Sequence, residues 1–175
     1  MERVPRANAL RGLLSLVDAM GGQLENRIRM QKSVYLLKML EVTDFRSTSF
    51  KYHHFGPYSR SVSDTLQDAI VSGLLVERRR DYGEEQSKYT YELTDAGQAW
   101  LEENAAGGDP QVKTFAPTFK ESHWRVLELA ATVLFVERDE HIGDRGNAMA
   151  RAIQLKPACM EWRSDAEALL KKLNL

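Results

Sequence analysis

The sequence has a single cysteine, Cys159, so a disulfide within the chain is excluded. Small secreted domains commonly depend on several disulfides, whereas proteins of a reducing compartment do not. The N-terminal segment also lacks an apolar run long enough to span a membrane, and no cleavage-site pattern follows it. These absences predict a cytoplasmic protein with no membrane partner.

The chain has no excess of charge of one sign, since 24 Lys and Arg oppose 25 Asp and Glu for a formal net charge of -1. A positive field that would attract phosphate groups to the whole molecule is therefore absent. The composition is otherwise that of a folded protein, with 43% hydrophobic and 28% charged residues. A chain of 175 residues can bury a core without a metal or a disulfide.

The motifs that mark common catalytic sites are missing. The sequence contains no P-loop, no glycine fingerprint after a strand and no nucleophile elbow. Cys159 has no histidine near it in the sequence that would activate its thiol. His53 and His54 are adjacent, so on a strand they point to opposite faces and cannot bind one metal together. We therefore predict that the protein is not an enzyme and has no metal or cofactor.

Hydrophobic spacing, capping residues and glycine stops predict the secondary structure. Helices are expected over residues 8–20, 26–40, 59–72, 95–104, 123–139, 147–154 and 164–173. A short strand is expected at 49–54, and a hairpin is expected from the runs 74–80 and 88–94 around a glycine-containing turn. The order helix, helix, strand, helix, hairpin, helix is that of a winged helix.

The predicted fold class is mainly α with a small β-hairpin (α+β). A winged-helix-like core is expected at 1–104, a linker or loop at 105–119, and a helical extension packed on the core at 120–175. The segment Trp124–Val136 is apolar around most of its circumference, which predicts burial on several sides. The alternative is that this helix forms an interface between copies of the chain, and a homodimer is left open.

Two motifs carry a resemblance to known proteins. RIRMQKSVYLLK (27–38) and HHFGPYS (53–59) together resemble the YwgA-like family and, more distantly, the Panacea domain of SocA-like antitoxins. The matching positions are Met30, Gln31, Lys32, Tyr35, Leu36, Phe55, Gly56, Pro57, Tyr58 and Ser59. Arg29 and Met30 stand where the family usually has Lys-Leu, and MLEVTDFRSTS is shorter and more polar than its Panacea counterpart. The YwgA-like match is therefore the better one, and the Panacea resemblance implies antitoxin or adaptor roles.

The resemblance implies an interaction module, so the leading function hypothesis is a non-enzymatic protein that binds another protein. The expected partner-binding residues are Gln31, Lys32, Tyr35, His54, Phe55, Tyr58 and Arg60. A structural role is an alternative for part of this set, because a glycine turn, a proline and a serine cap together start a helix. The basic residues between 26 and 40 either face solvent or form a site for an acidic partner.

The second hypothesis is a DNA-binding regulator that uses the third helix and the hairpin, or wing. Possible nucleic-acid contacts are Arg78, Arg79, Arg80 and Lys88. The wing carries as many acids as bases, and the third helix has Arg60 against Asp64 and Asp68. Helices that read the major groove usually present Arg, Lys, Asn or Gln instead. Protein binding is therefore favoured over DNA binding.

Overall fold

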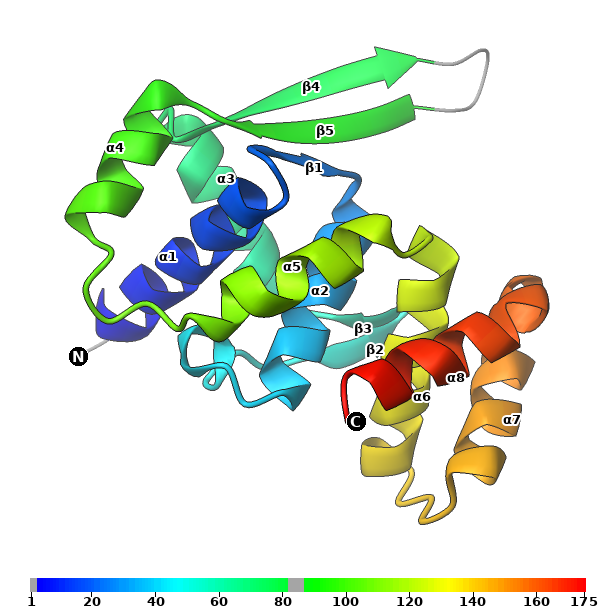
Figure 1. Ribbon diagram of the computed structural model, residues 1–175. Helices are drawn as coiled ribbons and strands as arrows, with labels where there is room; N and C mark the ends of the chain where they lie inside the picture. The colour runs from blue at the N-terminus through cyan, green and yellow to red at the C-terminus, as the bar shows by residue number, and fades with distance from the viewer. Residues whose placement is uncertain (1–2, 82–86) are drawn as a thin grey trace.

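A computed structural model of the chain describes residues 3–81 and 87–175, in which helices predominate (Figure 1). The α-helices are α1 (Arg3–Ala19), α2 (Arg27–Met39), α3 (Arg60–Val71), α4 (Asp95–Glu103), α5 (Gln111–Glu121), α6 (Trp124–Asp139), α7 (Arg145–Leu155) and α8 (Arg163–Lys172). The strands are β1 (Gln23–Glu25), β2 (Lys51–His53), β3 (Gly56–Tyr58), β4 (Leu75–Asp81) and β5 (Ser87–Leu93). Two 3-10 helices are η1 (Thr43–Phe45) and η2 (Pro157–Trp162). The protein is mainly α with small antiparallel sheets, which confirms the predicted fold class.

The first half of the chain combines helices α1 to α4 with a three-stranded antiparallel sheet in the order β1-β5-β4. Strand β1 was not predicted, because three residues with the burial pattern exposed, buried, exposed give little signal. Its central residue Leu24 lies opposite Tyr91 of β5, and both side chains are buried. Beyond this sheet, β4 and β5 extend as a hairpin away from the helices (Figure 1).

Capping side chains set the starts of most of these helices. Asn26 accepts a hydrogen bond from the backbone N–H of Arg29 at 2.7 Å, and Thr94 accepts one from Gly97 at 3.0 Å. The first helix differs from the prediction, since it begins five residues before the expected cap, Asn8. That side chain lies inside α1 and accepts a hydrogen bond from Arg11 at 3.0 Å.

Helix α6 lies at the centre of the second half, between α2 on one side and α7 and α8 on the other (Figure 1). Every side chain from Val126 to Val136 is buried, which confirms the predicted burial on several sides. The alternative of an interface between copies through this helix is wrong, because its apolar surface is already covered within one chain. Apolar residues of α1, α2, α6 and α8 belong to one hydrophobic cluster.

The predicted linker 105–119 is wrong over most of its length, because residues 111–119 belong to helix α5. The apolar side chains Val112, Ala116 and Phe119 recur at helical spacing and are fully buried against the core. Only residues 104–110 connect the helices α4 and α5. The glycines and the proline of that connection obscured the helical pattern that follows them.

Candidate functional site: a supported aromatic hairpin

Residues 51–58 form a short antiparallel hairpin, here named the aromatic hairpin, in which β2 pairs with β3. Its strand β3 contains Gly56 and Pro57, which in the sequence indicate a turn and a helix start and not a strand. Gly56 adopts a φ of +82°, which reverses the chain after the turn, and Pro57 lies opposite Tyr52. Tyr52 is 40% exposed and Phe55 is 50% exposed, so the hairpin presents large aromatic side chains to solvent.

The side-chain amide of Gln31 fixes the point where the hairpin ends. Its Nε2 donates to the carbonyl oxygen of Ser59 at 2.9 Å, and its Oε1 accepts from the Ser59 backbone N–H at 2.9 Å. The same Nε2 lies 3.0 Å from the hydroxyl of Ser63. Ser59 then caps α3 through its own hydroxyl. Gln31 thus replaces a strand partner for Ser59 and orients the first turn of α3.

Lys32 contacts the hairpin on its buried side, and the Lys32 side chain is 2% exposed. Its Nζ donates to the carbonyl oxygen of Pro57 at 2.7 Å. Burial lowers the pKa of Lys32 to about 7, the carboxylate of Glu128 opposes this shift, and the ammonium group of Lys156 adds to it. The hydrogen bond to Pro57 persists in either protonation state, because a neutral amine still donates.

A second lysine, Lys156, supports the turn itself. Its Nζ donates to the carbonyl oxygen of His54 and lies 3.3 Å from Oε1 of Glu128. The same nitrogen is 5.6 Å from the ring centroids of both Tyr52 and Phe55. Both distances are within the range of a cation–π interaction, so the exposed rings pack beside the buried amino group of Lys156.

The other carboxylate oxygen of Glu128, Oε2, faces Cys159 and Arg125. The Sγ of Cys159 donates to it at 3.5 Å, and Nη1 of Arg125 lies 3.9 Å from it. Burial and, after it, the charge of the Glu128 carboxylate raise the pKa of the Cys159 thiol to about 11. The thiol is therefore protonated near neutral pH and is a poor nucleophile. Lys32, Glu128 and Lys156 are named the buried charge cluster.

Backbone contact with α6 completes the support of the hairpin. A Cβ added to Gly56 would lie 2.5 Å from Oγ1 of Thr132, whose hydroxyl donates to the Glu128 carbonyl oxygen at 2.7 Å. Glycine is therefore required at this position by both the φ angle and the contact with the helix. The ring of Tyr52 also lies 5.9 Å from that of Phe135 on the same helix.

The lowered pKa of Lys32 predicts how stability depends on pH. In the unfolded chain this group titrates near its ordinary value of 10.5, so between pH 7 and pH 9 the unfolded chain binds more protons than the folded one. The free energy of unfolding therefore rises with pH in this window, by about 1–3 kcal/mol from this group. We expect a Lys32→Met variant to lose this rise. Urea denaturation of both proteins at pH 7, 8 and 9 measures the difference, and equal pH slopes would contradict it.

The expected partner-binding residues divide into two sets. Gln31, Lys32 and Tyr35 are 6%, 2% and 2% exposed, so their predicted position on the surface is wrong. The side chains of Gln31 and Lys32 bond to buried backbone groups. The ring of Tyr35 packs edge-on against the ring of Phe50, with 5.0 Å between the two centroids. The second set has side chains that reach the surface. That set comprises the exposed His54, Phe55 and Arg60 with the half-buried Tyr58.

The basic residues of α2 do not form a shared strip toward solvent. Arg27 contacts Glu77 at 2.9 Å, and Arg29 donates to the Ser122 carbonyl oxygen at 2.7 Å beyond the end of α5. Lys38 donates to the carbonyl oxygen of Thr48. With Lys32 below the hairpin, each of these cations is used to join α2 to another segment. The expectation of a solvent-facing residue holds for Arg27, which is 60% exposed, and is wrong for Lys32, which is buried.

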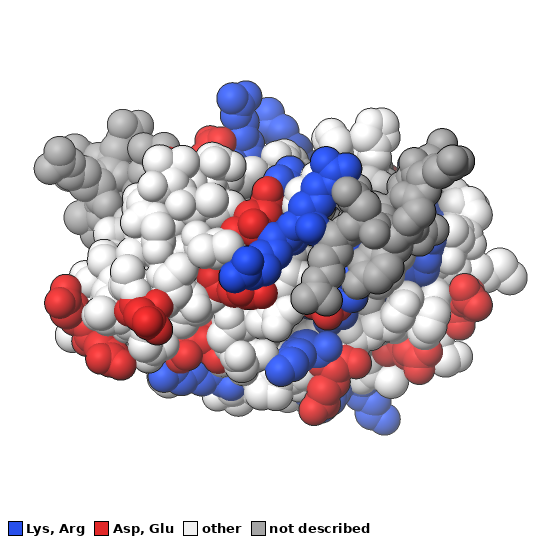
Figure 2. Space-filling view, turned by 90° about the horizontal axis from the view of Figure 1, so that it is seen from above, with Lys and Arg blue, Asp and Glu red and all other residues white. Residues whose placement is uncertain are grey.

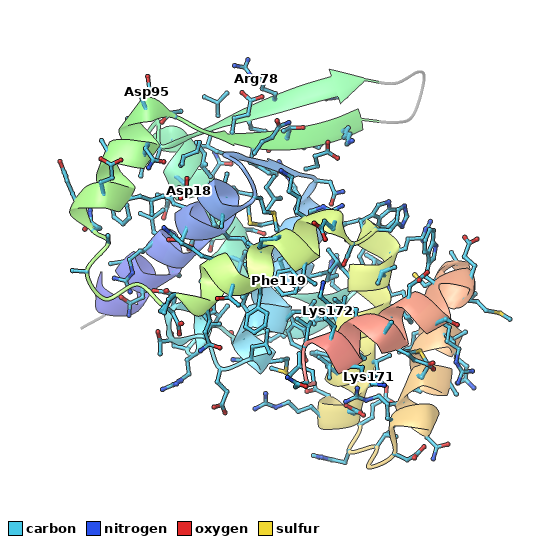
Figure 3. The ribbon with its side chains drawn as sticks, in the orientation of Figure 1. Asp18, Arg78, Asp95, Phe119, Lys171 and Lys172 are labelled. Carbon is cyan, nitrogen blue, oxygen red and sulfur yellow. The ribbon has the colours of Figure 1, made fainter. Side chains whose placement is uncertain are left out.

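Of the wing residues, Arg78 projects from the β4–β5 hairpin away from the helices (Figure 3). Arg78 pairs with Glu92 at 2.7 Å, and Lys88 pairs with Glu25 at 2.6 Å. Arg79 also takes part in an interaction, and the side chain of Arg80 lies outside the described residues. Figure 2 shows Lys and Arg atoms beside Asp and Glu atoms across this face.

Sequence reasoning did not identify Glu128, Thr132 or Lys156 as parts of the site. Glu128 did leave a signal, because it is a carboxylate in the middle of the apolar run WRVLELAATVLFV. A charged residue on a buried helix requires a partner of opposite charge. The partner's identity could not be derived, since Lys156 lies 28 residues further along the chain in an ordinary helix-end context.

Neither a metal site nor a membrane-spanning helix is found among the described residues. Within residues 3–81 and 87–175, no group of three or more His, Cys, Asp or Glu side chains is placed to hold a metal ion. Among the described helices, none combines the length and apolar character needed to cross a bilayer.

The sequence of this chain is similar to that of a known bacterial protein. No protein-family model matches the chain. The uncharacterised protein YwgA of Bacillus subtilis (strain 168) is 27% identical over 116 residues, which cover 66% of this chain and 68% of YwgA. This similarity supports the predicted YwgA-like relationship, whereas the resemblance to the Panacea domain stays a prediction.

Proposed function

We propose that this chain is a non-enzymatic, winged-helix-like interaction protein that binds a protein partner through the aromatic hairpin. The observation that carries the proposal is the contrast between the two sides of the hairpin. On the outside, Tyr52 and Phe55 are 40% and 50% exposed. On the inside, Lys32 and Lys156, which are 2% and 7% exposed, donate to the carbonyl oxygens of Pro57 in β3 and His54 in the turn. A rigid surface with exposed aromatic rings is typical of interaction hot spots, since little conformational entropy is lost on binding.

The winged-helix-like description rests on the order of elements. Helix α1, strand β1, helices α2 and α3 and the β4–β5 hairpin follow one another as in a winged helix, with β1 completing the sheet beside β5. The aromatic hairpin is an addition to this plan, inserted between α2 and α3. An insertion that the core fold does not require favours a role in function.

The absence of an enzyme activity is part of the proposal. Cys159 is 1% exposed and its thiol is held protonated, and Lys32 is 2% exposed with its amine bonded to a backbone oxygen. Neither group has the access to solvent that a nucleophile needs. The lowered pKa of Lys32 accompanies a structural role, because its amine holds the hairpin in place, and such roles are a known cause of pKa shifts.

DNA binding is the second candidate, and the winged-helix-like order of elements is what favours it. The charges of the wing oppose it, because Arg78 and Lys88 are already paired with carboxylates. Helix α3 also presents Asp64 beside Arg60, at 3.9 Å. An electrophoretic mobility shift at low salt separates the two functions, since contacts to phosphates weaken steeply as salt is added.

Site-specific photocrosslinking tests the proposed function. A photoreactive phenylalanine analogue is placed at Phe55 and, as the matched control, at Val71, which is 77% exposed at the far end of α3. In cells that naturally produce the protein, we expect a discrete protein adduct from position 55 and none from position 71. Tyr52→Ala should abolish the adduct. Equal labelling at both positions, or no adduct at position 55, would overturn the proposal.

A further inference from the structure

The charges around the aromatic hairpin are unevenly distributed. Below it, the buried charge cluster contains the two lysines Lys32 and Lys156 but one carboxylate, Glu128. Arg125, 3.9 Å from that carboxylate, adds a third cation at the edge of the cluster. A buried charge is screened less by solvent than an exposed one, so this excess acts on the surface above it. Burial lowers the pKa of Lys32 to about 7, but even where Lys32 is neutral the two cations Lys156 and Arg125 outnumber Glu128, so the buried side of the hairpin carries more positive than negative charge.

The surface charges near the hairpin do not cancel this excess. Glu140 and Arg151, whose charges both act on Tyr52, form a pair at 2.8 Å. Lys51 at the start of β2 is exposed and has no carboxylate partner among the described residues. At the other end of the hairpin, Arg60 is 89% exposed and contacts Asp64 only at 3.9 Å, a pair that binds weakly in solvent.

We propose that the aromatic hairpin recognises an acidic protein segment, in which Asp or Glu residues flank an apolar side chain. This inference rests on the proposed function and names the chemistry of its partner. The apolar side chain packs on the rings of Tyr52 and Phe55, and the carboxylates lie toward Lys51 and Arg60. The buried lysines contribute through their field without touching the partner.

The burial of these cations favours a protein segment over a nucleic acid. Single strands stack on aromatic side chains, but they also need a row of exposed Lys and Arg that contact successive phosphates, whereas the exposed Lys51 and Arg60 lie at opposite ends of the hairpin. Here Lys32 and Lys156 are 2% and 7% exposed, and their amines are bonded to backbone oxygens of the hairpin. Long-range complementarity to the carboxylates of a partner requires no such direct contact.

A selection from a random dodecapeptide phage library tests the inference. The full chain is the target, and the Phe55→Ala variant is used to remove peptides that bind elsewhere. Phe55 is 50% exposed, so this variant is expected to fold, which circular dichroism checks. We expect the retained peptides to be acidic and to share an apolar residue. Fluorescence anisotropy with a synthetic copy should show affinity that falls with salt.

Substitutions then separate the possible results. We expect Phe55→Ala to weaken binding of the synthetic peptide about tenfold or more and Lys51→Glu about two- to fivefold, whereas Val71→Ala leaves it unchanged. Hairpin-dependent peptides that are neutral or basic would overturn the acidic partner but retain the proposed function. The absence of any hairpin-dependent peptide would count against the proposed function itself. Displacement of the peptide by an oligothymidylate would replace the protein segment with a nucleic acid.

Discussion

A Glu128→Gln substitution is expected to lower the free energy of unfolding by about 3–5 kcal/mol, the usual cost of removing one partner from a buried ion pair. Its carboxylate is 3% exposed and is the counterion of Lys156 at 3.3 Å. Glutamine retains nearly the same shape, so the loss reports the charge rather than a cavity. Without the carboxylate, Lys156 must remain charged without a counterion or lose its proton. Urea denaturation followed by circular dichroism measures the effect.

The matched control for this prediction is Glu167→Gln. Glu167 pairs with Arg163 at 2.9 Å in α8, but both side chains are about half exposed. The same chemical change there should cost no more than about 0.5 kcal/mol. A double Glu128→Met, Lys156→Met variant should be more stable than Glu128→Gln alone, because Lys156 is removed together with its counterion. Equal effects of the two glutamine substitutions would contradict the assigned role of Glu128.

Gly56→Ala is expected to destabilise the fold by about 2–6 kcal/mol, because two costs act at one position. The φ of +82° is strained for a residue with a side chain, at about 1–3 kcal/mol. The new Cβ would also meet Oγ1 of Thr132 at 2.5 Å, and overpacking of this kind typically costs a further 1–3 kcal/mol. Thr132 cannot rotate freely, since its hydroxyl is bonded to the Glu128 carbonyl oxygen. Thermal unfolding and urea denaturation both measure the loss.

Gly73→Ala separates the two costs. Gly73 has a similar φ of +73°, but no atom lies within 4 Å of an added Cβ. Its substitution should show the backbone cost alone. Adding Thr132→Ala to Gly56→Ala should relieve the steric part, so the double variant should be more stable than the sum of the single effects predicts. If Gly56→Ala and Gly73→Ala prove equally destabilising, the hairpin is not in close contact with α6.

For the motif that carries the family resemblance, the sequence indicated which residues belong together but not what they do. The residues Gln31 and Lys32 and the segment Gly56–Ser59 were recognised as belonging together, and the structure joins them by hydrogen bonds. Their role was not derivable, because a polar residue within a helix looks the same whether it faces solvent or a backbone carbonyl group. The structure assigns the polar residues to support and leaves Tyr52, His54 and Phe55 at the surface.

The sequence by itself determined the mainly α fold class, most of the helices and the β4–β5 hairpin. These features depend on local spacing, caps and motifs, which neighbouring residues encode. Only the tertiary structure decided that Gln31 and Lys32 of α2 are buried, that α5 replaces most of the expected linker, and that Glu128 and Lys156 meet on the buried side of the hairpin. Such contacts join residues far apart in the chain. Their partners are selected by packing and by the cost of burying an unpaired charge, neither of which a local pattern specifies.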